Sequence, residues 1–167
     1  IETTRVSKMS TRSTVAMKTE DGLVGMYVHW DGYPTGNGQI LKDSYDNDAK
    51  VAELIALGDL SKLGSEIGQV HYDTSIKRAE GTPELALFDD YCLAYNRDRG
   101  ESWNDVSPRT FDDVKQWVDD FAESWCEYFY LWNGADWLVS NGKHDENGFP
   151  VFDFIDVAIM QQQAENV

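Results

Sequence analysis

The sequence predicts an α+β domain in which helices pack on an antiparallel sheet, itself built from two hairpins plus a central strand. Residues 13–30 and 127–140 each contain two strand-like runs that flank an Asp-Gly or Asn-Gly pair, and such pairs favour tight hairpin turns. Apolar residues recur at helical spacing near 38–45, 48–57, 111–125 and 152–162. Since 41% of the 167 residues are hydrophobic, the chain can bury a core without disulfide bonds.

Residues 9–167 are expected to form this single domain. Residues 1–8 precede Met9 and show no periodicity, so we expect an N-terminal extension outside the fold. Cys92 and Cys126 lie neither in a CxxC motif nor beside an evident histidine partner, which predicts two buried free thiols. With no signal peptide, long apolar run or lipidation motif in the sequence, we expect a cytoplasmic protein without membrane attachment.

In the first hairpin, a two-residue turn at Asp21-Gly22 determines the expected register. It places Val15 opposite Val28, and Arg12 opposite Asp31 as a cross-strand ion pair. Strand alternation assigns one face to the core, namely Val15, Met17, Val24, Met26, Val28 and Trp30. The other face carries Thr14, Ala16, Lys18, Tyr27 and His29.

The motif that closes this hairpin is His29, Trp30, Asp31, Gly32, Tyr33 and Pro34. After its turn, Thr35 or Asn37 can cap a short helix. The backbone N–H groups of Gly36, Asn37 and Gly38 would then lie at the positive end of a helix, where phosphates and carboxylates bind. The spacing matches neither the P-loop nor the dinucleotide fingerprint, so a tight turn without a ligand is the simpler interpretation.

The middle of the chain gives weaker signals. Asp48 can cap the helix near 48–57, whereas residues 59–83 look irregular. Residues 91–97 alternate as a strand. Arg97 and Arg99, which end this strand and follow it, could form an anion site because guanidinium groups suit phosphate and carboxylate. Local salt bridges to neighbouring acids are the alternative.

The clearest helical pattern runs from Thr110 to Trp125, with Thr110 and Asp113 resembling a capping box. Its apolar stripe includes Trp117 and Phe121, which we expect in the core. The opposite face is acidic and consists of Asp112, Asp113, Asp119, Asp120 and Glu123. Such a row either keeps a helix solvated or imitates the phosphates of a nucleic acid.

The second hairpin, about Asn133-Gly134, is apolar on both faces. Tyr128, Tyr130, Trp132 and Trp137 share one face, and Phe129, Leu131 and Leu138 share the other. Either both faces are covered or one is a contact surface. Residues 145–148 form a turn without the ligand spacing of an EF-hand, and we expect no metal or cofactor.

The net charge of −16 is concentrated in the second half of the chain. Residues 1–83 carry 12 acids and 9 bases, giving −3, whereas residues 84–167 carry 18 acids and 5 bases, giving −13. Direct binding to nucleic acid or an anionic membrane needs clustered Lys and Arg, so this balance argues against both. It is compatible with a partner protein that has a basic surface.

Four runs of residues carry a family resemblance. They are Met-Ser-Thr-Arg-Ser-Thr at 9–14, His-Trp-Asp-Gly-Tyr-Pro at 29–34, Val-Ala-Glu-Leu-Ile-Ala-Leu-Gly-Asp-Leu at 51–60 and Arg-Asp-Arg-Gly-Glu at 97–101. Through these runs the sequence resembles a family of short proteins of tailed bacteriophages and prophages, over most of residues 9–140. The resemblance implies an accessory protein acting in the cytoplasm of an infected bacterium. It implies no activity that can be transferred residue by residue.

No catalytic signature is legible in the sequence. His29, His71 and His144 form no HxH or HExxH motif, and there is no GxSxG motif. We therefore expect a non-enzymatic phage protein that binds a host macromolecule through its acidic, aromatic second half, in host takeover or counter-defence, for example as a phosphate-mimicking inhibitor. One alternative is a small-ligand binder that sequesters a nucleotide or another anion. A virion or structural component is a second alternative.

Overall fold

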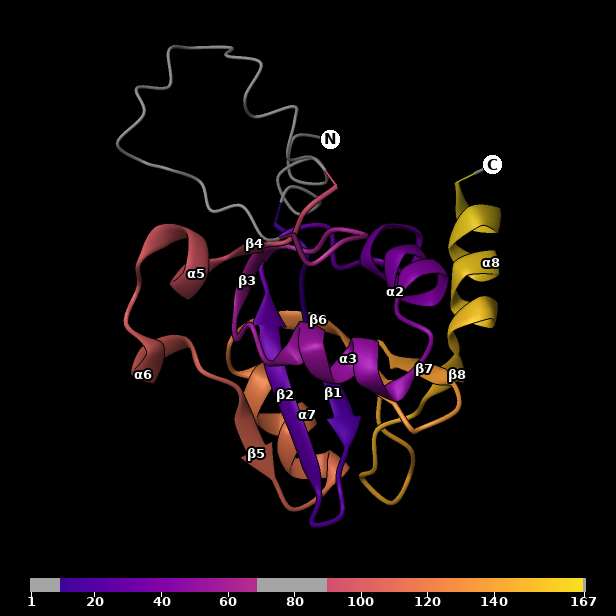
Figure 1. Cartoon of the computed structure of the whole chain (residues 1–167). Helices are drawn as coiled ribbons and strands as arrows, with labels where there is room; N and C mark the ends of the chain where they lie inside the picture. The colour runs from indigo at the N-terminus through magenta and orange to yellow at the C-terminus, as the bar shows by residue number, and fades with distance from the viewer. Residues whose placement is uncertain (1–9, 69–89, 167) are drawn as a thin grey trace.

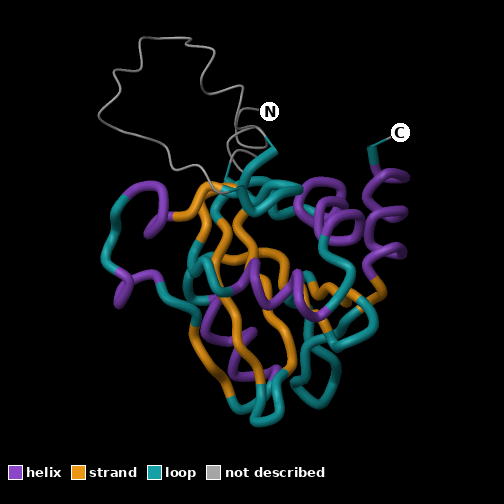
Figure 2. Tube along the Cα trace, viewed as in Figure 1, coloured by secondary structure: helices purple, strands orange, loops and turns teal. Residues whose placement is uncertain are grey.

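The computed structural model describes residues 10–68 and 90–166, which form one eight-stranded mixed sheet with helices on both faces (Figures 1 and 2). The first strands and helices are β1 (Arg12–Lys18), β2 (Leu23–Val28), the π-helical turn η1 (Pro34–Gly38), α2 (Gln39–Ser44), α3 (Asp48–Ile55) and β3 (Leu60–Lys62). The middle elements are β4 (Leu93–Ala94), α5 (Tyr95–Arg99), α6 (Trp103–Val106), β5 (Arg109–Phe111) and α7 (Val114–Ala122). The chain continues with β6 (Cys126–Trp132), β7 (Trp137–Ser140), β8 (Asp153–Phe154) and α8 (Ile155–Glu165).

The sheet is mixed, so the predicted α+β class is confirmed while the purely antiparallel arrangement is wrong. The strand order is β4-β3-β2-β1-β6-β7-β8, and β5 also pairs with β2. The two hairpins β1–β2 and β6–β7 are antiparallel, but β1 pairs with β6 in parallel, and so does β2 with β3. Figure 1 shows indigo β1 and orange β6, which are far apart in the sequence, in the same sheet.

Two hydrophobic cores lie on opposite faces of this sheet. The first core contains Val15, Met26 and Val28 of the sheet and is covered by α2, α3 and α8. The second core contains Ala16 and Phe129 and is covered by α7. In Figure 1, α3 crosses in front of the strands and α7 lies behind them, so the sheet is the middle of three layers.

The first hairpin forms with a longer turn than predicted. Lys18 pairs with Leu23, and the Thr19 N–H donates to the Gly22 carbonyl at 2.8 Å. The turn therefore has four residues, and Val15 lies opposite Met26 rather than Val28. A shift of two residues keeps every side chain on its predicted face, and Val15, Met26 and Val28 are buried as predicted. The prediction is wrong for Trp30, which follows the end of β2 and is 39% exposed. The predicted pair of Arg12 with Asp31 is wrong, because this register brings Arg12 level with His29.

The second hairpin is confirmed, with Trp132 paired to Trp137 across residues 133–136. Both of its aromatic faces are covered. Tyr130, Trp132 and Trp137 are buried in the first core, and Phe129 and Leu131 in the second. This answers the question left open by the sequence, since neither face is a free contact surface.

Helix starts differ from the predictions where a neighbouring residue supplies a better cap. Asn47, rather than Asp48, accepts the Lys50 N–H and caps α3. Asp113 accepts the Gln116 N–H and caps α7. The predicted capping residue Thr110 lies in β5 instead, because residues 109–111 pair with β2.

The predicted strand at 91–97 is wrong over most of its length. Only Leu93 and Ala94 form β4, and α5 begins at Tyr95. The buried Asp98 carboxylate accepts the Ala94 N–H at 2.7 Å, which favours a helical turn over a continued strand. Residues 59–83, predicted to be irregular, include β3; residues 69–83 of that stretch and the extension 1–8 lie outside the described residues.

Cys92 and Cys126 are free and buried, as predicted. Burial raises the pKa of the Cys92 thiol and raises that of Cys126 to about 12, so both remain protonated at neutral pH. Within 10–68 and 90–166, no helix combines the length and apolar character needed to span a bilayer.

Candidate functional site

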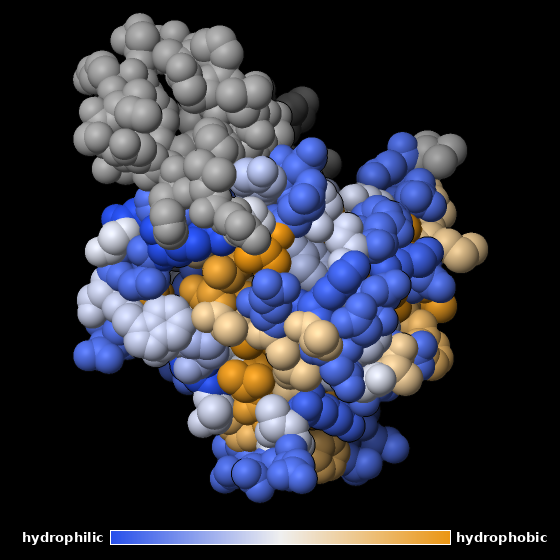
Figure 3. Space-filling model, in the orientation of Figure 1, coloured by the Kyte–Doolittle hydropathy of each residue, from blue (hydrophilic) through white to orange (hydrophobic). Residues whose placement is uncertain are grey.

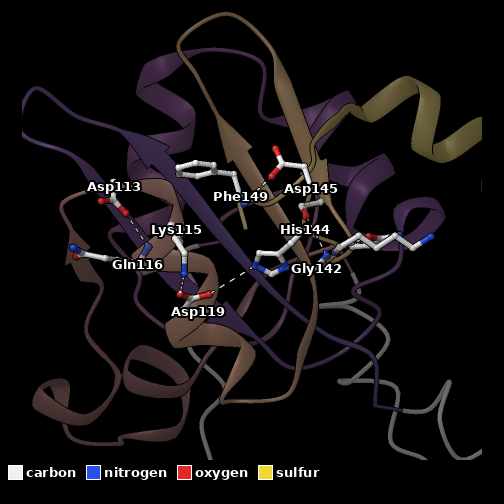
Figure 4. A network of polar contacts seen from close by, with 11 residues as sticks. Asp113, Lys115, Gln116, Asp119, Gly142, His144, Asp145 and Phe149 are labelled. Atoms are coloured by element: carbon white, nitrogen blue, oxygen red, sulfur yellow. Dashed lines mark hydrogen bonds and ion pairs between the residues drawn. The ribbon is translucent and has the colours of Figure 1, made fainter. Parts of the chain in front are cut away.

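The acidic face of α7 is exposed along its length. Trp117, Val118 and Phe121 are buried beneath the helix, whereas all five predicted acids are exposed. Two of the five have structural contacts. Asp113 caps the helix, and Asp119 accepts from Lys115 Nζ at 2.7 Å and lies 3.9 Å from His144 Nε2 (Figure 4). Within the described part of the chain, the carboxylates of Asp112, Asp120 and Glu123 form no ion pair.

Exposed aromatic residues flank this face. Trp125 follows the end of α7 with 75% of its surface exposed and a φ of +69°. Phe149 is 57% exposed, in the segment 142–152 that packs beside α7 through His144 and through Phe152 stacked on Trp117. We define the acidic surface as Asp112, Asp113, Asp119, Asp120, Glu123 and Trp125.

The predicted anion cradle after Pro34 is already satisfied from within the protein. The Gly36 and Gly38 N–H groups donate to the Tyr33 carbonyl at 2.9 and 3.5 Å, and the Asn37 N–H donates to the Asp31 carbonyl at 2.8 Å. The Thr35 N–H donates to Gln162 Oε1 of α8 at 2.8 Å. These donors do not point at an open site, which contradicts the anion-site interpretation of Gly36, Asn37 and Gly38.

Side chains hold the same turn in place. Asn37 is buried, and its Nδ2 donates to the Trp30 carbonyl at 2.9 Å and to Ser13 Oγ at 3.3 Å. Neither Thr35 nor Asn37 makes the predicted side-chain cap. Tyr130 of β6 donates its hydroxyl to the Gly32 carbonyl at 2.6 Å, and burial raises its pKa well above the ordinary value. The motif 29–34 is therefore part of a tightly bonded connection between the sheet and α2.

Arg97 and Arg99 have different environments. The Arg97 guanidinium donates to the Asp98 carboxylate at 3.0 Å and to the carbonyls of Cys92 and Gly68 at 2.9 and 2.8 Å. This is the local salt bridge considered as the alternative, so Arg97 is committed to the structure. Arg99 is exposed and lies over the ring of Tyr95, 5.4 Å from its centroid.

The structure also brings two arginines close to a histidine and a tyrosine from other parts of the sequence. His29 Nδ1 and the Tyr27 hydroxyl are 2.8 Å apart, and the His29 ring meets Trp30 edge-on at 4.5 Å. The register of Ser13 with Val28 brings Arg12 level with His29. Arg99 lies over Tyr95, whose N–H donates to the Asp59 carbonyl at 3.2 Å, and the Asp59 carboxylate accepts the Tyr27 N–H. Partial burial, and then Arg12 and Arg99, lower the pKa of His29. We define the cationic cluster as Arg12, Tyr27, His29 and Arg99. Strand alternation predicts that Arg12, Tyr27 and His29 share one face of the sheet. The position of Arg99 beside them is visible only in the folded structure.

Asp59 links β2 to β5 next to this cluster. Its buried carboxylate accepts the Tyr27 N–H and Arg109 Nη2, each at 3.0 Å. Along β2, Val28 pairs with β3, and residues 23–25 pair with β5. The Asp59 carboxylate bonds to β2 at Tyr27, between these two pairings, and to Arg109 of β5. Burial raises the pKa of Asp59, against the opposing effects of these two partners. The carboxylate is thereby committed to the fold.

A cleft of about 990 Å³ opens between the turn 33–35, the end of β7 and α8. Its lining mixes charges of both signs, including Glu127, Lys143, Asp153 and Glu165. Exposed apolar residues of the segment 149–160 include Val151, which lines the cleft, and Val157 and Met160 of α8, and Figure 3 shows hydrophobic residues at the edge formed by α8. Among the described residues, no group of three or more His, Cys, Asp or Glu side chains could hold a metal ion.

Comparison of the chain with protein-family models, with curated proteins and with solved structures finds no match.

Proposed function

We propose that this protein is a non-enzymatic bacteriophage accessory protein that binds a basic host protein through the acidic surface, in host takeover or counter-defence. The observation that carries the proposal is the run of exposed carboxylates along and beside α7, of which Asp112, Asp120 and Glu123 form no ion pair with any described residue. Between residues 112 and 127 the chain has six acids, namely Asp112, Asp113, Asp119, Asp120, Glu123 and Glu127, against the single base Lys115. Lys115 itself pairs with Asp119, so a strong negative field remains.

Such a field suits a partner whose surface is basic, including a protein that normally binds nucleic acid. Opposite potentials on two surfaces accelerate association, and the acceleration weakens as salt screens the charges. Trp125 supplies the other element of a binding surface, since large exposed aromatic side chains serve as anchors that slow dissociation. Its position directly after α7 would place the anchor at one end of the acidic row.

The environments of the two cysteines, of His29 and of His144 favour a binding role over a catalytic one. The two thiols are buried with raised pKa values, which disfavours the thiolate that a nucleophile requires. His29 is engaged with Tyr27, and His144 lies beside Asp119. Neither histidine is paired with a serine or cysteine nucleophile among the described residues, which supports a non-enzymatic role.

The test is a pull-down from host lysate with identification by mass spectrometry, followed by association kinetics with the purified partner. The variant combines Asp112→Asn, Asp120→Asn and Glu123→Gln, which removes three charges and leaves the contacts of Asp113 and Asp119 intact. A matched control removes three exposed charges elsewhere, through Glu20→Gln, Asp21→Asn and Glu53→Gln.

We expect the acidic-surface variant to associate more slowly and to show a weaker dependence on salt, whereas the control associates like the wild type. Trp125→Ala should raise the dissociation rate with little effect on association. Equal slowing by the variant and the control would point to net charge alone and would contradict a specific acidic surface.

A further inference from the structure

The cationic cluster lies at one end of the central strands, on the face that carries α7. Arg12 begins β1 and is flanked by Cys126 of β6, its paired residue, and by His29, which the register of Ser13 with Val28 brings level. Thr14 points toward α7, because its hydroxyl accepts from Trp117 Nε1 at 3.0 Å. Side chains two residues apart on a strand share a face, so Arg12 belongs to that face as well.

The two guanidinium charges in this cluster disfavour a further positive charge. Arg12 and Arg99 both act on His29, and like charges at close range disfavour each other. Carboxylates are abundant, with 30 acids against 14 basic residues in the chain. Elsewhere in the structure, carboxylates form ion pairs with arginines: Arg97 pairs with Asp98, and Arg109 pairs with Asp59. Over the described residues, however, neither Arg12 nor Arg99 forms an ion pair.

Arg12 also carries an unsatisfied donor. Its Nε is buried and has no hydrogen-bond partner in the described structure. A buried donor without an acceptor is costly, and native structures contain few of them. The Asp59 carboxylate, which acts on the neighbouring Tyr27, is already bonded to Arg109 and to the Tyr27 N–H. The described residues therefore supply no acceptor for Arg12 Nε.

We propose that the cationic cluster binds a phosphate group, either free or carried by a nucleotide. Guanidinium groups present several donors in a planar fork that matches phosphate oxygens, and Arg12 and Arg99 would together neutralise its charge next to His29. Trp30, in contact with His29 and 39% exposed, offers a ring on which a nucleobase could stack. This site is built from β1, the end of β2 and α5, and it does not depend on the acidic surface of α7.

Titration calorimetry tests the proposal with three probes: inorganic phosphate, ADP and adenosine. Binding of phosphate and ADP with similar affinity would assign the site to the phosphate alone, whereas much tighter binding of ADP would add a contribution from the base. Both results support the phosphate site. Saturable binding of adenosine that matches ADP would overturn it, because the phosphate would then contribute nothing. Absence of binding by all three probes would overturn it as well.

Substitutions identify the residues. Arg99→Ala and Arg12→Gln should each weaken phosphate or ADP binding by at least about tenfold, as expected for loss of a hydrogen bond to a charged group. Lys18→Ala is the matched control, because it removes an exposed cation from the opposite end of the same strand, and its affinity should equal that of the wild type. Weakening by all three substitutions to the same extent would overturn the assignment in favour of nonspecific attraction.

A spectroscopic readout complements the affinities. The ring resonances of His29 should shift on addition of phosphate to the wild type, and those of the distant His144 should not. If Arg12→Gln is unstable, Arg99→Ala decides, because Arg99 is exposed and its removal leaves no buried group unpaired. Unchanged His29 resonances at phosphate concentrations that saturate binding would place the anion elsewhere and overturn the proposed site.

Discussion

Trp117 Nε1 donates a hydrogen bond to Thr14 Oγ1 at 3.0 Å, and the same hydroxyl donates to the Met26 carbonyl at 2.8 Å. One threonine thus connects α7 to β1 and β1 to β2. Both Trp117 and Thr14 are completely buried, and this chain of two direct bonds crosses from one layer of the fold to the next. Together with the packing of the second core, it holds α7 on the sheet with its acidic face turned outward.

Trp117→Ala or Phe121→Ala should each destabilise the protein by about 3–5 kcal/mol, because both side chains are fully buried aromatics and their removal leaves a cavity. Chemical denaturation measures the loss. Gln116→Ala, on the exposed side of the same helix, is the control and should change stability by less than about 0.5 kcal/mol. Wild-type stability in both core variants would contradict their burial.

Thr14→Val keeps the shape of the side chain but leaves the buried Trp117 N–H without an acceptor. We expect a loss of about 1–3 kcal/mol, the penalty for an unsatisfied buried donor. Thr14→Ser retains the hydroxyl and should lose less. The comparison, made by urea denaturation, isolates the hydrogen bond; equal stability of the valine and serine variants would show that the bond contributes little.

Tyr130→Phe removes the hydroxyl that donates to the Gly32 carbonyl. That carbonyl then loses its buried donor, at a cost of about 1–3 kcal/mol, and the turn that leads into α2 should exchange its amide hydrogens faster. Tyr128→Phe on the same strand is the control, since the described structure shows no hydrogen bond from the Tyr128 hydroxyl. Hydrogen exchange that is unchanged across residues 31–38 in Tyr130→Phe would refute this role.

His29 should make stability depend on pH. Its pKa is lowered in the folded protein by partial burial and by Arg12 and Arg99, so the native state binds the proton less readily than the unfolded chain. The resulting stabilisation is fully present above the unfolded pKa of about 6.5 and is lost as pH falls through the folded pKa. Denaturation from pH 7.5 to 5 should show a steeper loss for the wild type than for His29→Gln. Parallel profiles would contradict the shift.

The sequence predicts this fold well where the signal is local. Alternation in the first hairpin places Val15, Met26 and Val28 in the core although the predicted turn is too short, because a slip of two residues preserves the faces. Helical periodicity places Trp117 and Phe121 inside and the α7 acids outside. These are patterns within about fifteen residues, and they do not depend on which segments meet.

The sequence fails to predict the structure where a distant segment or a single side chain determines the local conformation. Nothing in residues 12–18 indicates that their second neighbour is the parallel strand β6. The alternation at 91–97 is typical of a strand, but the carboxylate of Asp98 bonds to the Ala94 N–H and starts a helix. The sequence predicts free N–H groups after Pro34, but the folded turn brings the carbonyls of Asp31 and Tyr33 into position to accept them. These acceptors cannot be recognised from the sequence. The cationic cluster needs three separate segments, so only the tertiary structure shows it.

The parallel pairing of β1 with β6 also has a consequence for how the chain folds during synthesis. Val15 pairs with Tyr130, so the centre of the sheet cannot close until the ribosome has made more than a hundred further residues. Until then the β1–β2 hairpin has an unpaired apolar edge, and such edges promote aggregation. Pairing of segments so far apart also slows folding, because loop closure must precede the contacts that stabilise it. We therefore expect refolding to be slow and its yield to fall with protein concentration.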